Sequence, residues 1–159
     1  MRLLSEKEQK EGTLMKRTYI DSGVLIAAIR GVDPIAQKAL NILDDPEREF
    51  VSSVFVKLEV LPKAMYYKQS IEQEFYTTFF ENVAQWADNY ANTIQAAYQE
   101  ACDTGINALD ALHVAAAASL HADELITTER SVKPIHRATS VKVVSLHTMT
   151  MRDDKPQSE

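Results

Sequence analysis

The hydrophobic positions of the chain alternate between short β-type runs and longer segments of helical periodicity. The β-type runs predict strands over residues 18–21, 49–52, 124–127 and 141–145, and residues 83–86 fit either a strand or a loop. Apolar residues that recur every three or four positions predict helices over residues 22–29, 34–43, 54–67, 70–79, 92–104 and 108–120. Strands that alternate with helices predict the α/β class, here a three-layer α/β/α sandwich around a central, mostly parallel twisted sheet.

Polar residues indicate where several of these helices begin. Asp33 is a good N-cap, and Pro34 suits the first helical position, where its missing N–H costs nothing. Ser53 can cap the helix that follows it, and Ser70 with Gln73 has the spacing of a capping box. We therefore expect side-chain caps at the starts of three helices.

Length and composition bound the organisation of the chain. A chain of 159 residues with 45% hydrophobic residues suits one globular domain, which we expect over residues 17–148. A flexible N-terminal extension (1–16) and a flexible tail (149–159) would flank it, and Met15 is an alternative start of translation. No apolar run approaches the roughly 20 residues that cross a bilayer. The single Cys102 cannot form an intramolecular disulfide, so we expect a cytoplasmic protein that is not attached to a membrane.

The overall charge restricts how the chain could bind nucleic acid. The formal net charge is −6 and the pI is about 5.2, which argues against a broad basic face that coats nucleic acid. A nuclease is still compatible with this charge, because a bound metal ion reverses the sign of an acidic cleft locally.

Four carboxylates stand out because each is flanked by residues that prefer burial. Asp21 ends the first predicted strand, Glu59 and Asp110 lie within apolar helical segments, and Glu129 follows the predicted strand over residues 124–127. An unpaired carboxylate is costly to bury. Because ligands of parallel sheets gather at the carboxyl ends of the strands, we expect the four acids in one cleft. Hard oxygen ligands of this kind suit Mg²⁺ or Mn²⁺.

Three of these acids have ordinary structural alternatives. Asp21 could cap the following helix, although Ser22 can do so itself. Glu59 and Glu129 could be solvated surface residues.

Asp110 is the clearest of the four. It is a weak helix former within an Ala-rich segment, and Asn107 is the better cap. His113 lies three residues later on the same helical face. It is a candidate metal ligand or base, but orienting Asp110 or packing in the core is the simpler interpretation.

Other residues near the acids are candidates for contact with a phosphodiester substrate. The hydroxyls of Thr127 and Thr128 could bind a carboxylate or a phosphate, and Arg130 and Lys133 could position phosphates. Tyr19 and Tyr66 could stack on bases. Strand, surface and core roles are the simpler alternatives for all of these residues.

The order of these motifs resembles the PIN domain family. The opening strand-to-helix motif corresponds to residues 19–26, and a looser second motif to residues 52–59. The third and fourth motifs correspond to residues 109–117 and 125–130. The resemblance spans about residues 17–146.

The resemblance implies a specific chemistry. Similar members are single-domain endoribonucleases that use Mg²⁺ or Mn²⁺, and many are VapC-like toxins paired with an antitoxin. By this resemblance Asp21, Glu59 and Asp110 would be the core metal ligands and Glu129 the fourth catalytic acid. The family more often has Asp at that fourth position. The implied substrate is single-stranded RNA, cut to leave a 3′-hydroxyl and a 5′-phosphate, and a cognate antitoxin and a homodimer are the implied partners.

Three other functions were weighed against this one. A catalytically weakened module that binds nucleic acid or a partner would keep the fold, and Glu129 and the acidic surface motivate this alternative. An aspartyl phosphatase would need a second acid two residues after Asp21, where the chain has Gly23. A Rossmann nucleotide-binding domain would need a Gly-rich turn, but the chain has only four glycines.

Overall fold

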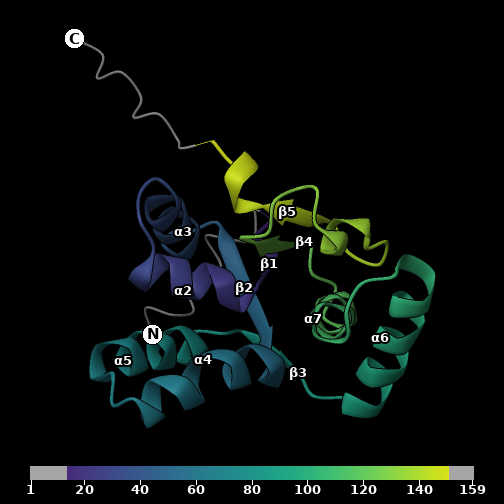
Figure 1. Ribbon diagram of the computed structural model, residues 1–159, viewed down its shortest axis with the longest axis horizontal. Coiled ribbons are helices and arrows are strands. Elements are labelled where there is room, and N and C mark those ends of the chain that lie inside the picture. The colour runs from purple at the N-terminus through teal and green to yellow at the C-terminus, as the bar shows by residue number, and fades with distance from the viewer. Residues whose placement is uncertain (1–13, 151–159) are drawn as a thin grey trace.

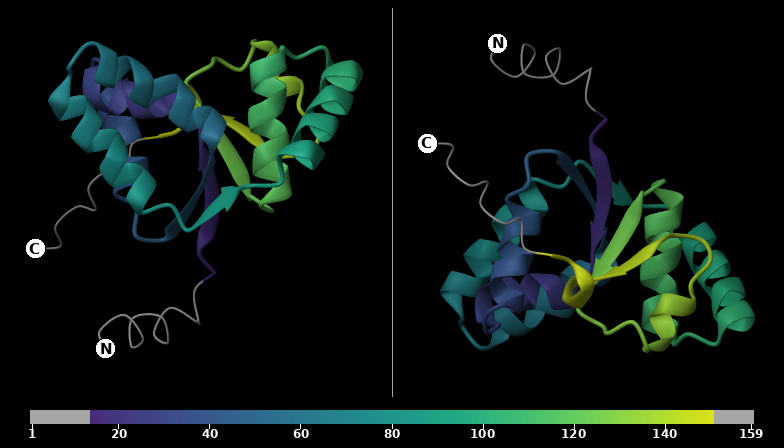
Figure 2. Two further views of the ribbon diagram at one scale, coloured as in Figure 1. Left: turned by 90° about the horizontal axis from the view of Figure 1, so that it is seen from below. Right: turned by 90° about the horizontal axis from the view of Figure 1, so that it is seen from above.

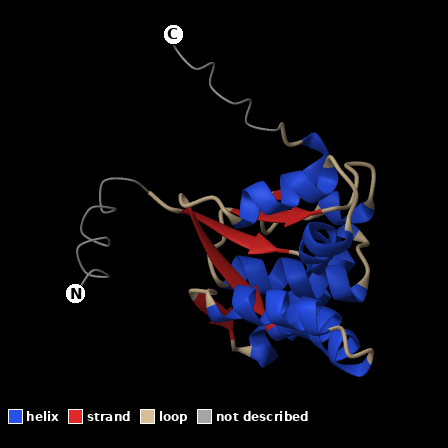
Figure 3. Ribbon diagram, turned by 90° about the vertical axis from the view of Figure 1, so that its left-hand side faces the viewer, coloured by secondary structure: helices blue, strands red, loops and turns tan. Residues whose placement is uncertain are grey.

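The computed structural model describes residues 14–150, and its centre is a five-stranded sheet in the order β3-β2-β1-β4-β5. The strands are β1 (Lys16–Ile20), β2 (Arg48–Ser53), β3 (Gln85–Ala87), β4 (Glu124–Thr127) and β5 (Val143–Ser145). Every neighbouring pair is parallel. The strands fan out across the molecule in the twist expected of such a sheet (Figure 3). The segment that fitted either a strand or a loop contributes to β3.

Helices cover both faces of the sheet, which confirms the predicted three-layer sandwich. They are α2 (Ser22–Arg30), α3 (Ile35–Leu43), α4 (Val54–Tyr66), α5 (Ser70–Glu81), α6 (Tyr90–Thr104) and α7 (Ala108–Ser119), with short 3₁₀ turns at Pro134–Arg137 and Leu146–Thr148. Helices α2 to α5 lie on one side of the sheet (Figure 1). On the other side α7 packs against the strands and α6 lies outside α7 (Figure 2).

The central strand β1 is buried on both faces of the sheet. Thr18, Tyr19 and Ile20 at the end of β1 are all fully buried, as expected for a parallel strand between two helical layers. The predicted buried helix is α7, in which Val114 and Ala116 are fully buried. Small alanine side chains let α7 lie close to the sheet.

The predicted side-chain caps are wrong at three helix starts. Helix α3 begins after Pro34, with no side-chain cap from Asp33. Ser53 precedes α4 but makes no capping bond, because its hydroxyl is bonded to Tyr19. Ser70 is already inside α5, and Gln73 donates instead to the carbonyl of Ala64 across the α4–α5 hairpin.

The described part of the chain ends close to the predicted domain limits. Most of the predicted N-terminal extension (1–16) and tail (149–159) lies outside the described residues, so the flexibility of these segments stays a prediction. Within residues 14–150, no helix has both the length and the apolarity that crossing a bilayer requires.

Candidate metal centre

Asp21 lies directly after β1 at the carboxyl edge of the sheet, where it is held from two sides. Its Oδ1 accepts a hydrogen bond from the Ser22 backbone N–H at 2.8 Å, so it is the N-cap of α2. Its Oδ2 accepts from the Thr127 hydroxyl at 2.9 Å. The expectation that Ser22 makes capping by Asp21 unnecessary is therefore wrong. The Ser22 hydroxyl also donates to Oδ1, at 3.4 Å. A carboxylate offers about four acceptor sites, so these three bonds still leave a lone pair of Asp21 for a cation.

Glu59 of α4 and His113 of α7 both lie close to Asp21. His113 Nε2 is 2.5 Å from Glu59 Oε1 and 3.8 Å from Asp21 Oδ1. One ligand atom from each of the three residues lies within 4.8 Å of the others, which is the spacing of atoms that could share one metal ion. His113 therefore orients Glu59, and the interpretation that it orients Asp110 is not supported by a hydrogen bond.

Asp110 belongs to the same electrostatic cluster. It is half-buried in the first turn of α7, where Asn107 caps the helix and donates a side-chain bond to Asp110 Oδ2 at 3.0 Å. Burial raises the pKa of Asp110 above its ordinary value, and the negative charges of Asp21 and Glu129 raise it further. Asp110 is therefore within electrostatic reach of Asp21 and Glu129. The ligand atoms that lie within 4.8 Å of one another belong to Asp21, Glu59 and His113.

Glu129 is the outermost of the four acids. Its side chain is exposed, but both its backbone N–H and its backbone carbonyl are hydrogen-bonded. Its N–H donates to the Thr127 hydroxyl at 3.1 Å, and its carbonyl accepts from His136 Nε2 at 2.9 Å. The loop after β4 thus holds the fourth acid at the rim of the cluster.

The carboxylates at the two edges of the sheet differ in their ion pairs. At the amino edge Glu124 is 2% exposed, and it is paired with Arg48 and with Lys16 at 3.0 Å. At the carboxyl edge, Asp21 and Asp110 form no ion pair with a lysine or arginine of residues 14–150. The structural carboxylate Glu124 is therefore paired with two cations, whereas Asp21 and Asp110 have no such pair.

The family follows from comparison with known domains. The PIN domain profile matches residues 18–135, a segment that contains all four acids. The chain belongs to the PIN domain family. Members of this family are typically nucleases.

Solved structures agree with this assignment at the level of the fold. A chain of VapBC2 from Rickettsia felis, bound to a promoter DNA fragment, is 14% identical, with a TM-score of 0.61 over 81% of this chain and 98% of that one. For VapBC-1 from nontypeable Haemophilus influenzae the identity is 20% and the TM-score 0.61, over 83% and 99% of the two chains. A toxin–antitoxin complex from Klebsiella pneumoniae is 17% identical, with a TM-score of 0.60 over 83% of this chain and 99% of that one. A comparison with curated proteins gives no match.

A buried chain of hydrogen bonds in this PIN domain joins Ser53, Tyr19, His113 and Glu59, and we call it the relay. It fixes the orientation of His113, which is 1% exposed. The carboxylate of Glu59 can only accept, so the proton on Nε2 of a neutral His113 points to Glu59. Nδ1, at 2.7 Å, then accepts from the Tyr19 hydroxyl, which in turn accepts from Ser53 Oγ at 2.6 Å. Burial raises the pKa of Tyr19 well above its ordinary value, although the bond from Ser53 opposes this, so Tyr19 stays a neutral donor. Tyr19 is fully buried, so it cannot stack on a base.

The relay also explains the ionisation of Glu59. Burial alone would raise the pKa of Glu59, but the hydrogen bond from His113, together with Ser22 and Lys63, lowers it overall. Glu59 is therefore ionised at neutral pH. One signal in the sequence points to the relay, since a tyrosine inside a buried strand must place its hydroxyl against a partner.

The predicted substrate contacts lie on or after β4. Thr127 is fully buried, and its hydroxyl is engaged with Asp21 and with the backbone of Glu129. Thr128 is half-buried against α2, where only a glycine fits, because a Cβ on Gly23 would lie 2.4 Å from Thr128 Oγ1. Contact of either threonine with a substrate stays a prediction.

The two predicted cations, Arg130 and Lys133, are exposed on the loop after Glu129. The Lys133 N–H donates to the Arg130 carbonyl at 2.9 Å, which turns the loop back on itself. Neither side chain forms an ion pair within the part of the chain that the structure describes. Both are free to meet a phosphate, and that role stays a prediction.

Removing the Tyr19 hydroxyl should destabilise the protein. Tyr19→Phe leaves Ser53 Oγ and His113 Nδ1 buried without their partner, which costs about 1–3 kcal/mol in the free energy of unfolding. Urea unfolding at pH 7 measures it. The matched control is Tyr98→Phe at an exposed site, which should change stability by less than about 0.5 kcal/mol. Equal effects of the two changes would show that the relay contributes nothing.

The raised pKa of Asp110 predicts a pH-dependent gain in stability for Asp110→Asn. Because the folded state holds the Asp110 proton more tightly than the unfolded state, ionisation lowers stability as pH rises through the folded pKa. In metal-free buffer at pH 7 the variant should be more stable than the parent, by less than about 1 kcal/mol because solvent screens a half-exposed group.

That difference should shrink below about pH 4, where Asp110 becomes increasingly protonated in the unfolded state as well as in the folded one. Urea titrations of both proteins at pH 7 and pH 3.5 give the comparison. An Asp110→Asn protein that is less stable at pH 7, or a difference that does not vary with pH, would contradict the proposed repulsion.

Proposed function

We propose that this PIN domain is a metal-dependent endoribonuclease that hydrolyses phosphodiester bonds of single-stranded RNA. The observation that carries the proposal is the convergence of acids from separate segments at one edge of the sheet, without a lysine or arginine ion pair to Asp21 or Asp110 within residues 14–150. The PIN family and the fold it shares with toxin–antitoxin complexes support this function. We expect the protein to act in the cytoplasm.

The residues fit a divalent cation. Asp21, Glu59 and Asp110 would hold it, with Glu129 as a fourth, outer acid, and these are the proposed catalytic residues. Carboxylate oxygens are the ligands that Mg²⁺ and Mn²⁺ prefer. A cation would also relieve the repulsion that raises the pKa of Asp110. When bound, the ion would supply positive charge to the phosphodiester oxygens and make a water molecule more acidic.

The side chains of the chain itself supply orientation. Thr127 holds Asp21 and His113 holds Glu59, so the two carboxylates are positioned before any substrate arrives. His113 is enclosed and already bonded at both nitrogens, which makes it a positioning residue in this proposal. Water is therefore the proposed nucleophile, and the resemblance to PIN nucleases implies a 3′-hydroxyl and a 5′-phosphate as products.

Single-stranded RNA suits the charge of the molecule. A net charge of −6 gives a rigid duplex no broad basic face, whereas a flexible strand can enter a narrow acidic site. Arg130 and Lys133, next to the outermost acid, are the proposed phosphate contacts at the entrance.

Toxin activity is the biological role we propose for this nuclease. Structural neighbours come from VapBC and other toxin–antitoxin complexes, so a cognate antitoxin is the proposed partner and a homodimer the proposed assembly. A small open reading frame directly upstream that ends in an amphipathic helix would support this role over a housekeeping nuclease.

Asp110→Asn should abolish cleavage of a single-stranded RNA in the presence of Mn²⁺. The change removes a charge from the proposed ligand set while keeping the shape of the side chain, so the loss should be at least about 100-fold. Gel assays of a labelled RNA measure the rate. Asp44→Asn, at an exposed acid after α3, is the matched control and should cleave normally.

An Asp110→Asn protein with undiminished, Mn²⁺-dependent cleavage would remove Asp110 from the site. Absence of metal-dependent cleavage in the parent protein would favour the alternative, a PIN fold that binds nucleic acid or a partner without cutting.

A further inference from the structure

Two adjoining hollows lie along the edge strand β3, and together we call them the β3 groove. The first, of about 220 Å³, is lined by Val54, Lys57, Trp86, Ala87 and Tyr90. The second, of about 300 Å³, shares Lys57 and Trp86 with the first. The shared residues make the two hollows one continuous depression between α4, β3 and the start of α6.

The β3 groove offers rigid aromatic surface beside a positive charge. Trp86 is half-buried and is braced by Phe80, with ring centroids 5.6 Å apart. Lys57 Nζ lies over the Trp86 ring, 5.8 Å from its centroid, so a base that stacks on this face displaces the ammonium, which stays within reach of the phosphate. The side chain of Tyr90 is 49% exposed in the same hollow. A flat ring held in place, a second open ring and a cation are the parts of a platform on which nucleic-acid bases stack.

The charge around the β3 groove is unevenly distributed. Lys57 is exposed and forms no ion pair among residues 14–150. Glu81 lines only the second hollow, so that hollow is less suited to an anion. A phosphate would therefore lie in the first hollow, beside Lys57 and Tyr90.

The register of the sheet places this hollow next to the acid cluster. Ala87 pairs with Ser53, and Tyr19 pairs with Val51. The same register extended by two residues, just past the end of β1, places Asp21 beside Ser53. Strands lie about 4.8 Å apart, so Asp21 and Ala87 are two strand spacings, or about 10 Å, from one another. Val54 in the hollow directly follows Ser53, which belongs to the relay that orients Glu59. The groove and the acids therefore share the carboxyl edge of the sheet.

We propose that the β3 groove binds a single strand of nucleic acid, with bases stacked on Trp86 and Tyr90 and a phosphate against Lys57. This inference rests on the proposed function, because the strand would continue from the groove across the acid cluster. A duplex hides the faces of its bases, so the groove selects single strands. Tyr19 of β1 is buried and cannot stack on a base, so we assign this role to Trp86 and Tyr90, on the other side of β2.

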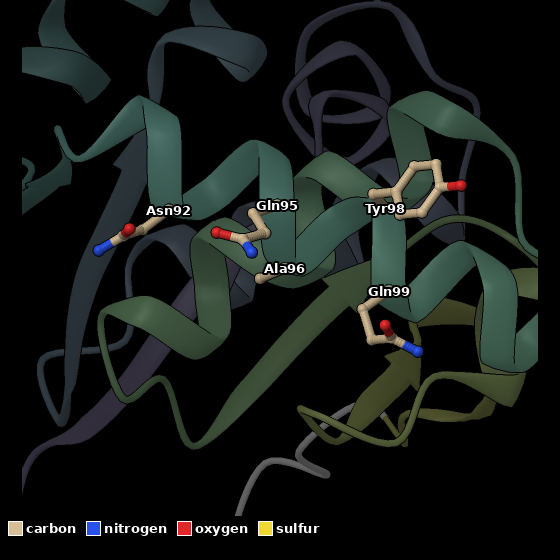
Figure 4. A pocket seen from close by; sticks show the side chains of 5 residues that line it. All are labelled: Asn92, Gln95, Ala96, Tyr98 and Gln99. Atoms are coloured by element: carbon tan, nitrogen blue, oxygen red, sulfur yellow. The ribbon is translucent and has the colours of Figure 1, made fainter.

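A larger pocket on α6 provides the contrast. It measures about 570 Å³ and is lined by uncharged side chains of Asn92, Gln95, Ala96, Tyr98 and Gln99. Figure 4 shows these side chains spread along the helix, with a single aromatic ring among them. Without a cation or a second ring it lacks the parts of a stacking platform, and Tyr98 is the matched control for Tyr90.

Tryptophan fluorescence tests the proposal directly, because Trp86 is the single tryptophan of the chain. The full-length protein is titrated with an eight-nucleotide oligouridine in EDTA-containing buffer at about 50 mM salt, where no metal-dependent cleavage occurs. Saturable quenching of Trp86 is expected. An equal quenching by a duplex of the same length, or no quenching by the single strand, would overturn the proposal.

Two variants locate the binding within the groove. Tyr90→Ala should raise the Kd about 5- to 150-fold, the range that corresponds to the loss of one stacked base. Lys57→Gln should lower the slope of log K against log salt by about 0.7, as expected for one phosphate contact. Tyr98→Ala and Lys142→Gln are the matched controls and should bind like the parent. Groove variants that bind as well as the controls, with unchanged circular dichroism, would overturn the proposal.

Binding and cleavage are separable. Quenching without Mn²⁺-dependent cleavage would support the β3 groove and contradict the nuclease function. Cleavage by a protein whose Trp86 is never quenched would support the nuclease and overturn the groove.

Discussion

Repulsion among carboxylates gathered at one edge of the sheet is the constraint on which the site of this PIN domain depends. Burial raises the pKa of Asp110, and the charges of Asp21 and Glu129 raise it further, so ionising Asp110 is less favourable in the fold than in solution. Hydrogen bonds from neutral donors hold the neighbouring carboxylates in place, from Thr127 to Asp21 and from His113 to Glu59. A site built in this way gains most from a divalent cation, because the cation removes a cost that the protein already bears.

The parallel sheet makes this crowding geometrically simple. Because β1, β2 and β4 all run the same way, the residues that follow them meet at one edge, and α4 and α7 add acids from either side of the sheet. The edge strand β3 ends on the same side of the sheet, with Trp86 among its paired residues and Tyr90 three residues after its end. The same topology thus accounts for a centre that could bind a metal and for an adjacent surface that could hold the substrate.

The sequence was sufficient where the signal is local. The apolar run of β4 predicted its bounds without error, Asn107 was identified as the cap of α7, and Gly105 ends α6 with φ of +71°. The capping box failed because Gln73 found a partner in the neighbouring helix. Short polar side chains have several acceptable partners, and tertiary packing selects among them.

The candidate site shows the same limit. An acid among apolar neighbours is a local signal, so Asp21, Glu59 and Asp110 could be selected from the sequence, although their roles as ligands are still a prediction. The partner of His113 could not be predicted from the sequence. Helical spacing suggested Asp110, whereas the partner is Glu59, 54 residues away along the chain. The groove at Trp86 was also hidden, because its residues come from separate elements that only the fold brings together.

Calorimetry of Mn²⁺ binding shows whether the gathered carboxylates bind a divalent cation, and it needs neither an RNA target nor turnover. The parent protein is compared with Asp21→Asn and with Asp33→Asn, a control outside the acid cluster. We expect a binding isotherm for the parent and for the control, and a Kd raised at least about tenfold when Asp21 is neutralised. Equal affinity in all three proteins, or no binding by the parent, would contradict this expectation.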